Sequence, residues 1–179
     1  MSEPVNVTRL APCAMVSLRA DLSDPAVADA CRATAGAAAP GMRRIIVGTG
    51  GSVAWMAPDE LLFIVPAAAP ARAAIAAALA GRRHLAVDLS DARTRFRIAG
   101  PGAREVIAKG APVDLSRGAF AAVVDGAGDF RRTRLGQIAA AFWAPEDDAM
   151  EVICFRSVAD HAEAWLRQAA RDGSLPGVL

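Results

Sequence analysis

Short apolar runs separated by turn-forming residues dominate the chain, and this pattern predicts a protein built mainly from short strands. In the first half, strands are expected at residues 15–22, 43–47, 53–56 and 61–65. Between the first two, Ser23, Asp24 and Pro25 are typical of a helix start, and Gly36 marks its end. An Ala-rich helix is expected to follow Pro66 and Pro70 and to run through residue 80, before Gly81.

The second half repeats the alternation of strands and helices. Strands are expected at residues 84–89, 93–98, 130–135, 137–143 and 150–155, and a short helix at 103–109. The last helix is expected to open at Ser157, whose hydroxyl would cap it while Asp160 completes an imperfect capping box. Helical spacing predicts that its core stripe consists of Val158, Ala162, Trp165, Leu166 and Ala169.

These element orders predict an α+β fold with a mixed, mainly antiparallel sheet, packed helices and duplicated βαβ-like halves. No linker rich in Gly, Pro and Ser divides the halves. We therefore expect a single domain over residues 1–179, with its core at about residues 14–172.

The amino-acid composition and net charge argue against several classes of function. Hydrophobic residues make up 54% of the chain and charged residues 22%, which is typical of a folded, soluble protein. Aromatic residues make up 5%, Tyr is absent and the net charge is +1, so we expect no nucleic-acid binding. No apolar run approaches the ~20 residues of a membrane helix, and residues 1–10 lack the pattern of a signal peptide. We expect no membrane association and a cytoplasmic location.

Cysteine and histidine give little material for a metal site. Cys13, Cys31 and Cys154 are widely spaced, so we expect reduced thiols that act as small core residues. The two histidines, His84 and His161, have no partner at zinc-ligand spacing. We expect no bound metal on this chain.

Two further motifs invite a ligand-binding interpretation. Residues 48–52 are glycine-rich, but a strand pattern follows them where a dinucleotide-binding loop needs a helix, so they predict a hairpin turn. Five aspartates could contribute an acid–base pair, yet turn residues surround each of them and favour bonds to the backbone. They are Asp88, Asp91, Asp114, Asp125 and Asp129.

One predicted strand carries a charged face. Arg93, Arg95 and Arg97 alternate with Thr94, Phe96 and Ile98. These arginines could bind an anion, but such a basic face is usually solvated or paired with acidic residues of a neighbouring strand or of a partner. We favour the solvated or paired interpretation, with a subunit interface as a variant of it.

Several blocks, taken in order, resemble the gamma subunit of heterotetrameric sarcosine oxidase. The resemblance extends over most of the chain from about Ala14 onward. It rests on residues 55–62, 87–93, 100–104, 109–115, 134–137 and 155–160, continuing to Trp165 and Leu166. One departure is Ala111, where family members often have cysteine before the proline of the Pro-x-Asp-Leu block.

The resemblance implies a non-catalytic structural subunit of a complex that oxidatively demethylates sarcosine to glycine and passes the one-carbon unit to tetrahydrofolate. It implies alpha, beta and delta subunits as partners. FAD, FMN, NAD, tetrahydrofolate and zinc are then expected on the partners, with no cofactor, metal or catalytic residue on this chain.

A more distant resemblance connects the chain to the folate-binding domain of the glycine-cleavage aminomethyltransferase, through residues 88–90 and 100–101. It leaves open an alternative function as a stand-alone folate-binding or one-carbon transfer enzyme. That family carries an acidic pair leading into a later strand, where this chain has Arg131, Arg132 and Thr133, so we do not transfer the catalytic role.

The predicted assembly role requires a docking surface. We expect it to include Trp55, Phe142 and Trp143, with Arg93, Arg95 and Arg97 as further interface candidates. Each of the three aromatic residues has an alternative interpretation as an ordinary core residue.

Overall fold

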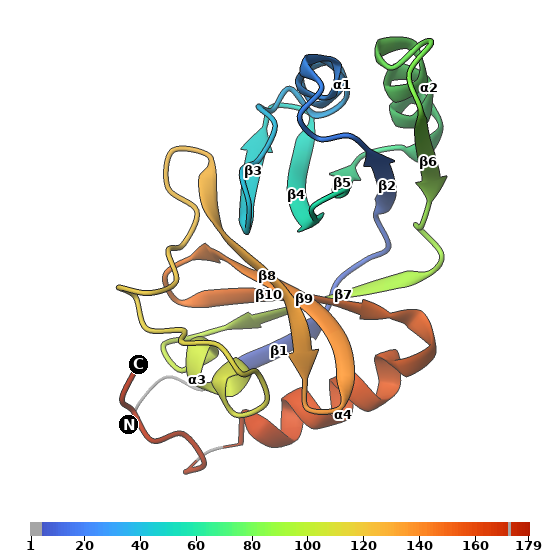
Figure 1. Ribbon diagram of the computed structural model, residues 1–179. Helices are drawn as coiled ribbons and strands as arrows, with labels where there is room; N and C mark the ends of the chain where they lie inside the picture. Colours follow the sequence, from blue (N-terminus) through green and yellow to red (C-terminus); the bar gives the residue numbers. More distant parts are fainter. Residues whose placement is uncertain (1–4, 172) are drawn as a thin grey trace. The chain divides into compact units, whose positions relative to one another are not determined.

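The computed structural model describes residues 5–171 and 173–179, and it is drawn in Figure 1. The chain divides into two compact units. Unit 1 comprises Met1–Ala11, Ala92–Val124 and Arg131–Leu179, and unit 2 comprises Pro12–Asp91 and Asp125–Phe130. Each unit has its own hydrophobic core. The single domain over residues 1–179, with a core at about 14–172, stays a prediction, and residues 1–4 and 172 lie outside the described chain.

Unit 2 is an antiparallel sheet covered by two helices. Its strands are β2 (Ala14–Ala20), β3 (Arg44–Gly48), β4 (Gly51–Ala57), β5 (Glu60–Val65) and β6 (His84–Asp88). Its helices are α1 (Pro25–Ala35) and α2 (Ala68–Ala78). The strand order is β3-β4-β5-β2-β6, and residues 127–129 at the start of β8 (Ala127–Leu135) pair with β3. Helix α2 links β5 to β6, which run parallel to each other with β2 between them, so this part of the unit is a split β-α-β arrangement.

Helix α1 shows why the first predicted helix is correct. The Asp24 carboxylate accepts a hydrogen bond from Ala26 N, and Pro25 occupies the first turn, where its missing N–H costs nothing. At the other end, Gly36 has φ of 61° and its N–H donates to Arg32 O, which closes the helix in the left-handed conformation that glycine favours.

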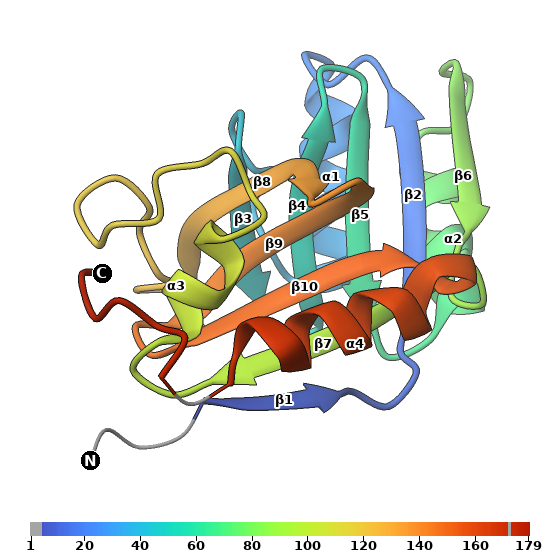
Figure 2. The same ribbon diagram turned by 90° about the horizontal axis from the view of Figure 1, so that it is seen from below.

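Unit 1 has the same two-layer construction. Its strands are β1 (Asn6–Arg9), β7 (Arg93–Ala99), β9 (Ile138–Glu146), β10 (Ala149–Phe155) and the later part of β8. Its helices are α3 (Ala103–Ala108), the 3₁₀ turn η1 (Arg156–Val158) and α4 (Ala159–Ala169), which Figure 2 shows running along the sheet. Phe96, Phe142 and Leu166 are among the fully buried residues of the core between these layers.

The strand orders of the two units match position by position. Unit 2 has β3-β4-β5-β2-β6, and unit 1 has β8-β9-β10-β7-β1. The last position is filled by the strand after α2 in unit 2, but in unit 1 it is filled by β1, from the beginning of the chain. The predicted α+β class with a mainly antiparallel sheet is confirmed. The predicted repeat is also present, except that the last strand of unit 1 comes from the beginning of the chain and not from a segment after its last helix.

Two local predictions are wrong. Asn6–Arg9 forms a strand where none was expected. The last α-helix begins at Ala159 after the 3₁₀ turn, and no side chain caps it, so Ser157 is not its cap. The predicted core stripe is close to the observed one, since Ala162, Leu166 and Ala169 are buried while Val158 and Trp165 are partly buried.

None of the helices within residues 5–171 and 173–179 combines the length and apolar character that crossing a membrane requires.

Candidate functional site

The three arginines of β7 lie on the sheet face of unit 1 that is opposite its helices, and we call this the arginine face. Antiparallel pairing places Arg97 opposite Glu151, Arg95 opposite Ile153 and Arg93 opposite Phe155 on β10. The intervening residues Phe96 and Ile98 are buried in the core on the helix side. The predicted two-faced strand is therefore confirmed, with its basic and apolar residues on the expected faces.

Acidic side chains pair with two of these arginines. Arg97 Nη1 lies 3.4 Å from Glu151 Oε1, and its Nη2 also binds Glu146. Arg95 Nε lies 3.5 Å from Glu151 Oε2. These contacts confirm the interpretation that the basic face pairs with acidic residues of a neighbouring strand.

The electrostatics of the arginine face centre on Glu151, whose side chain is 12% exposed. Burial raises the pKa of its carboxyl above the usual value of 4.5, and the nearby charges of Arg95 and Arg97 oppose that rise only in part. Neither Arg95 Nε nor Glu151 Oε2 has a hydrogen-bond partner among the described residues. The cluster is consequently a set of ion pairs whose hydrogen bonding is incomplete among the described residues.

An aromatic contact completes the face. The Arg93 guanidinium carbon lies 4.6 Å from the centroid of the Phe155 ring, which is the geometry of a cation–π interaction. Phe155 is 44% exposed. A subunit interface at the arginine face stays a prediction.

The three aromatic interface candidates occupy different environments. Trp143 lies opposite Glu151 in the β9–β10 register, so it belongs to the arginine face, and it is 5% exposed. Phe142 points to the other side of the sheet, where it is fully buried with its ring centroid 6.0 Å from that of Phe120. Trp55 is partly buried and packs against the core of unit 2. The structure brings Trp143 together with the arginines, whereas Phe142 matches its core alternative and offers no surface to a partner.

The glycine-rich segment at residues 48–51 joins β3 to β4 as a hairpin, with Gly48 opposite Gly51, so the predicted turn is confirmed. Gly50 N donates to Ala35 O at 2.9 Å, which ties the hairpin to the end of α1. A Cβ on Gly48 would lie 2.5 Å from the carbonyl carbon of Gly36, so only glycine fits this approach.

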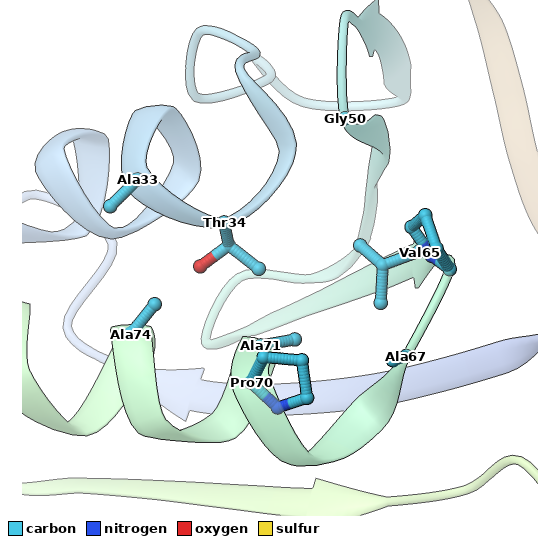
Figure 3. A pocket seen from close by; sticks show the side chains of 9 residues that line it. Ala33, Thr34, Gly50, Val65, Ala67, Pro70, Ala71 and Ala74 are labelled. Atoms are coloured by element: carbon cyan, nitrogen blue, oxygen red, sulfur yellow. The ribbon is translucent and has the colours of Figure 1, made fainter.

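A small cavity of about 260 Å³ lies beside this hairpin, between α1 and the start of α2 (Figure 3). None of its nine lining residues is charged, and most are alanine or proline. Its main polar group is the Thr34 hydroxyl, which is buried without a hydrogen-bond partner among the described residues. With one hydroxyl and no charge, the cavity has little to orient a polar substrate.

The five candidate aspartates do not form an acid–base pair. Asp88 and Asp114 each accept a hydrogen bond from the N–H two residues ahead, at Ser90 and Ser116, as predicted for turn aspartates. The bonds from Ser90, the hydroxyl first, lower the pKa of Asp88. Asp129 pairs with Arg44 at 3.2 Å.

The two remaining candidate aspartates and the two histidines lie in turns, at exposed positions or beside a backbone carbonyl. Asp125 occupies a turn with φ of 51°, and Asp91 follows β6 at an exposed position. His161 is exposed on α4, and Nδ1 of His84 lies 3.0 Å from Arg82 O. No three His, Cys, Asp or Glu side chains gather as a metal site in the described part of the chain.

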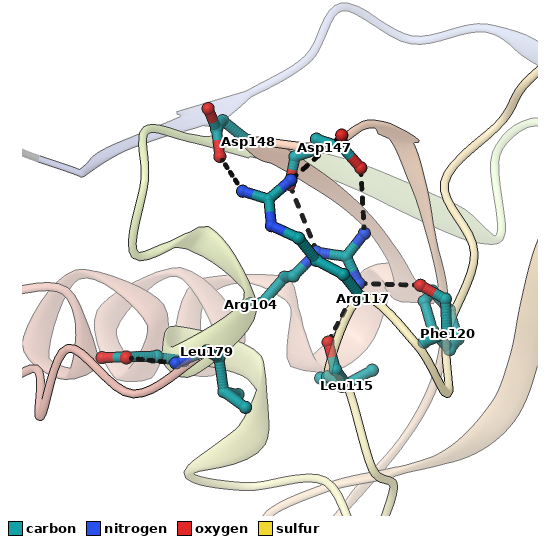
Figure 4. A network of polar contacts seen from close by, with 8 residues as sticks. Arg104, Leu115, Arg117, Phe120, Asp147, Asp148 and Leu179 are labelled. Carbon is teal, nitrogen blue, oxygen red and sulfur yellow. Dashed lines mark hydrogen bonds and ion pairs between the residues drawn. The ribbon is translucent and has the colours of Figure 1, made fainter.

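Sequence reasoning missed a buried cation, Arg104, which is 2% exposed in α3 of unit 1. Its Nη1 donates to the carbonyls of Leu115 and Phe120 at 2.9 and 2.8 Å, and its Nε donates to Asp147 O at 3.2 Å (Figure 4). Arg104 thereby links the connection after α3, through Leu115 and Phe120, to the β9–β10 hairpin at Asp147. Burial is the main cause that lowers the pKa of its guanidinium.

The next residue, Glu105, holds the last residues of the chain. Its carboxylate accepts hydrogen bonds from the N–H groups of Gly177 at 2.9 Å, Val178, and Leu179 at 3.0 Å. Burial alone would raise the pKa of Glu105, but these backbone donors together with Lys109 outweigh it and hold the pKa below its usual range. Nothing in the sequence pattern marked either residue, because arginine and glutamate in a short helix are ordinarily exposed.

A sequence model of the family described as "Sarcosine oxidase, gamma subunit family" matches residues 19–172. The chain belongs to this family. The predicted resemblance is thus confirmed over the part of the chain on which it rested.

Two curated relatives agree with the family. The chain is 30% identical over 129 residues to the sarcosine oxidase subunit gamma of Arthrobacter sp, and 32% identical over 120 residues to that of Corynebacterium sp. (strain P-1). The alignments cover 72% and 67% of this chain, but 61% and 57% of those relatives. The chain thus spans about 60% of the length of the curated relatives that it matches.

Two solved structures resemble the chain to different degrees. A chain of the heterotetrameric sarcosine oxidase from Corynebacterium sp. U-96, in complex with pyrrole 2-carboxylate, superposes with a TM-score of 0.84 at 25% identity, over 98% of this chain and 88% of that one. Glycine cleavage system aminomethyltransferase T from Bartonella henselae superposes with a TM-score of 0.58 at 13% identity, over 96% of this chain and 50% of that one. The second likeness concerns the fold alone, and it confirms the predicted fold relationship.

Proposed function

We propose that this chain is a structural, non-catalytic subunit of a heterotetrameric, flavin-dependent sarcosine oxidase, which demethylates sarcosine to glycine and passes the one-carbon unit to tetrahydrofolate. The observation that carries the proposal is the superposition, over 98% of the chain, on a chain of a heterotetrameric sarcosine oxidase. Its partners would be the alpha, beta and delta subunits.

The proposal assigns FAD, FMN, NAD, tetrahydrofolate and zinc to those partners. Two features of unit 1 and unit 2 support this division of labour. The charged cluster around Glu151 consists of cross-strand ion pairs, and the cavity beside the glycine hairpin offers a hydroxyl and no charge. Neither arrangement supplies the convergent polar groups that orient a cofactor.

The alternative of a stand-alone one-carbon transfer enzyme rests on a likeness of fold at 13% identity. Fold alone does not carry function to this chain. Asp129 in β8 is the carboxylate nearest to the position of the catalytic acid in that family, and it pairs with Arg44.

Two measurements test the non-catalytic role. Calorimetry of the isolated chain with FAD, NAD, tetrahydrofolate and Zn²⁺ is expected to give no binding at micromolar concentrations, and micromolar binding of any one would contradict the proposal. In the assembled enzyme, Asp129→Asn is expected to keep sarcosine turnover within a few-fold of wild type, because an acid–base group contributes about 10²–10⁴-fold. A hundredfold loss in an intact, cofactor-loaded complex would assign chemistry to this residue.

A further inference from the structure

Strand pairing in unit 1 brings several side chains into one row at an end of the arginine face. Arg93, the first residue of β7, lies opposite Phe155, the last residue of β10. In the pairing of β10 with β9, Cys154 lies opposite Ala140, so Phe155 and Ala139 are the next pair along these two strands. Three neighbouring strands thus each contribute one residue to the row.

The hairpin between β8 and β9 adds a fourth residue. Strand β8 ends at Leu135 and β9 begins at Ile138, so only two residues form the turn between these neighbouring strands. Gly136, the first of the two, has φ of 59°, and the common two-residue hairpin turns need a positive φ at that position. Such a turn pairs Leu135 with Ile138, which places Arg134 opposite Ala139. We call the resulting set the strand-end row, and it consists of Arg134, Ala139, Phe155 and Arg93.

The core of unit 1 shows which way the strand-end row faces. Leu135, Ala140 and Cys154 are each adjacent in sequence to a member of the row, and all three are buried in the core on the helix side. Because side chains alternate between the two faces of a strand, the members of the row point to the opposite face. Neighbouring strands lie about 4.8 Å apart, so the row extends about 14 Å from β8 to β7.

The strand-end row combines an exposed aromatic ring with two guanidinium groups. Phe155 is 44% exposed, and the Arg93 guanidinium carbon lies 4.6 Å from its ring centroid. Arg134 and Ala139 are also exposed, and within the described part of the chain no acidic side chain pairs with Arg134. Ala139 contributes only a methyl group between the ring and Arg134. The row therefore offers apolar surface between two cations, and none of its four members is acidic.

Positive charge is concentrated at this end of the arginine face. Further along β7, the other two arginines already form ion pairs with acidic residues of β9 and β10. Beside the strand-end row, Arg156 follows Phe155 directly, and Arg132 is two residues before Arg134 and so on the same face of β8. Both of these arginines are exposed. The surface around Phe155 thus has the charge to attract carboxylates, which guanidinium groups bind through two parallel hydrogen bonds.

We infer that the strand-end row is a docking site for an acidic segment of a larger oxidase subunit. Carboxylates of that segment would bind Arg134 and Arg93, and an apolar side chain would pack on Phe155. Arginine and large aromatic residues are enriched among the positions that dominate protein–protein binding. The net charge of the whole chain is +1, so the attraction is local, which suits a short acidic segment better than a long polyanion. This inference rests on the proposed function as an oxidase subunit.

Competitive assembly tests the docking site in the complete enzyme. Wild-type and variant full chains are co-expressed with the alpha, beta and delta subunits, and the complex is purified through a tag on the alpha subunit. Mass spectrometry then gives the ratio of variant to wild type in the complex, divided by their ratio in the lysate. Arg134→Glu and Phe155→Ala are each expected to enter the complex about tenfold less than wild type, because they remove an attractive charge and the apolar contact.

Arg72→Glu is the matched control for Arg134→Glu. Arg72 is exposed on α2 in unit 2, so the control makes the same charge change away from the row and should assemble like wild type. Thermal melting of each free chain verifies folding, and Arg134→Glu should melt like wild type because the residue is exposed.

Salt tests the acidic character of the partner segment. Because salt screens exposed charge pairs, rising NaCl should dissociate the wild-type chain from the complex, and Arg134→Gln should make that dissociation less sensitive to NaCl. Equal salt dependence of the two complexes would rule out an acidic segment at Arg134.

The remaining outcomes separate this inference from the proposed function. If Arg134→Glu and Phe155→Ala assemble as readily as wild type, or if Arg72→Glu loses as much as Arg134→Glu, the docking site is overturned while the subunit role stands. An effect of Arg134→Glu confined to self-association of the isolated chain in sedimentation would assign the row to a second copy and also overturn the inference. Absence of the wild-type chain from the complex would contradict the proposed function itself.

Discussion

Arg97 and Glu151 lie opposite each other on β7 and β10, with Arg97 Nη1 3.4 Å from Glu151 Oε1. The same guanidinium reaches Glu146 near the end of β9, so one arginine joins three neighbouring strands. The basic row that the sequence predicts to be solvated or paired thus forms cross-strand ion pairs within unit 1.

The first prediction concerns the pH dependence that Glu151 adds to stability. Burial raises its pKa above 4.5 in the folded chain, so the folded chain binds this proton more tightly than the unfolded chain does. The free energy of unfolding should therefore fall, through this group, as pH rises from 4.5 to the raised folded value. Carboxyl ¹³C NMR should show Glu151 titrating above 4.5. In urea denaturation, the free energy of unfolding of wild type minus that of Glu151→Gln should decrease as pH rises through the same range. A Glu151 midpoint below 4.5 would reverse the sign and contradict this account.

The second prediction separates a buried arginine from an exposed one. Arg104→Met should lower the free energy of unfolding by about 3 kcal/mol, because it leaves the carbonyls of Leu115, Phe120 and Asp147 without their donor. Urea denaturation measures the loss.

Arg117→Met is the matched control for Arg104→Met. Arg117 is half-exposed, and its guanidinium forms ion pairs with Asp147 at 3.0 Å and Asp148 at 2.7 Å. Its removal should cost less than about 1 kcal/mol. Equal losses for the two variants would show that the carbonyl bonds do not hold the connection.

The third prediction tests the glycine hairpin. Gly48→Ala should destabilise the chain by about 1–3 kcal/mol, because the added Cβ meets backbone atoms of Ala35 and Gly36 that cannot rotate away. Gly41→Ala places its Cβ in open space and should stay within about 0.5 kcal/mol of wild type. Thermal unfolding of both variants distinguishes the outcomes, and a Gly48→Ala chain as stable as Gly41→Ala would refute the close approach.

Much of this architecture was readable from the sequence because its signals are local. Pro25 marks the beginning of α1 because its φ is fixed, and Gly36 marks its end because glycine tolerates a positive φ. The glycines at 48–51 likewise predict a turn. Strand β1 could not be found in this way. Its four residues bury only Val7, and its partner β7 lies almost ninety positions later, so tertiary pairing alone makes it a strand.

The candidate site was less predictable for a similar reason. Alternation placed Arg93, Arg95 and Arg97 on one face correctly, but it could not say that Glu151 would lie across from Arg97, since cross-strand register is a long-range property. Arg104 escaped notice because a buried arginine has the same local pattern as an exposed one.

The fourth prediction concerns the thiols. Cys31 and Cys154 are buried as expected, and burial raises the pKa of Cys31 to about 11, whereas Cys13 is partly exposed. Since the thiolate is the reactive form, a disulfide reagent at pH 8 should label only Cys13 rapidly in the native chain, and all three cysteines after denaturation. Cys13→Ser should abolish the rapid phase. Persistence of that phase in Cys13→Ser would show that a buried thiol is accessible.

Affinity capture measures whether this chain assembles with larger oxidase subunits. Tagged full chain, purified from cells that also express the alpha, beta and delta subunits, should retain all three partners, together with flavin absorbance and sarcosine oxidation. Isolation of the same tagged chain with no flavoprotein bound, from cells in which those subunits are present and folded, would contradict the claim.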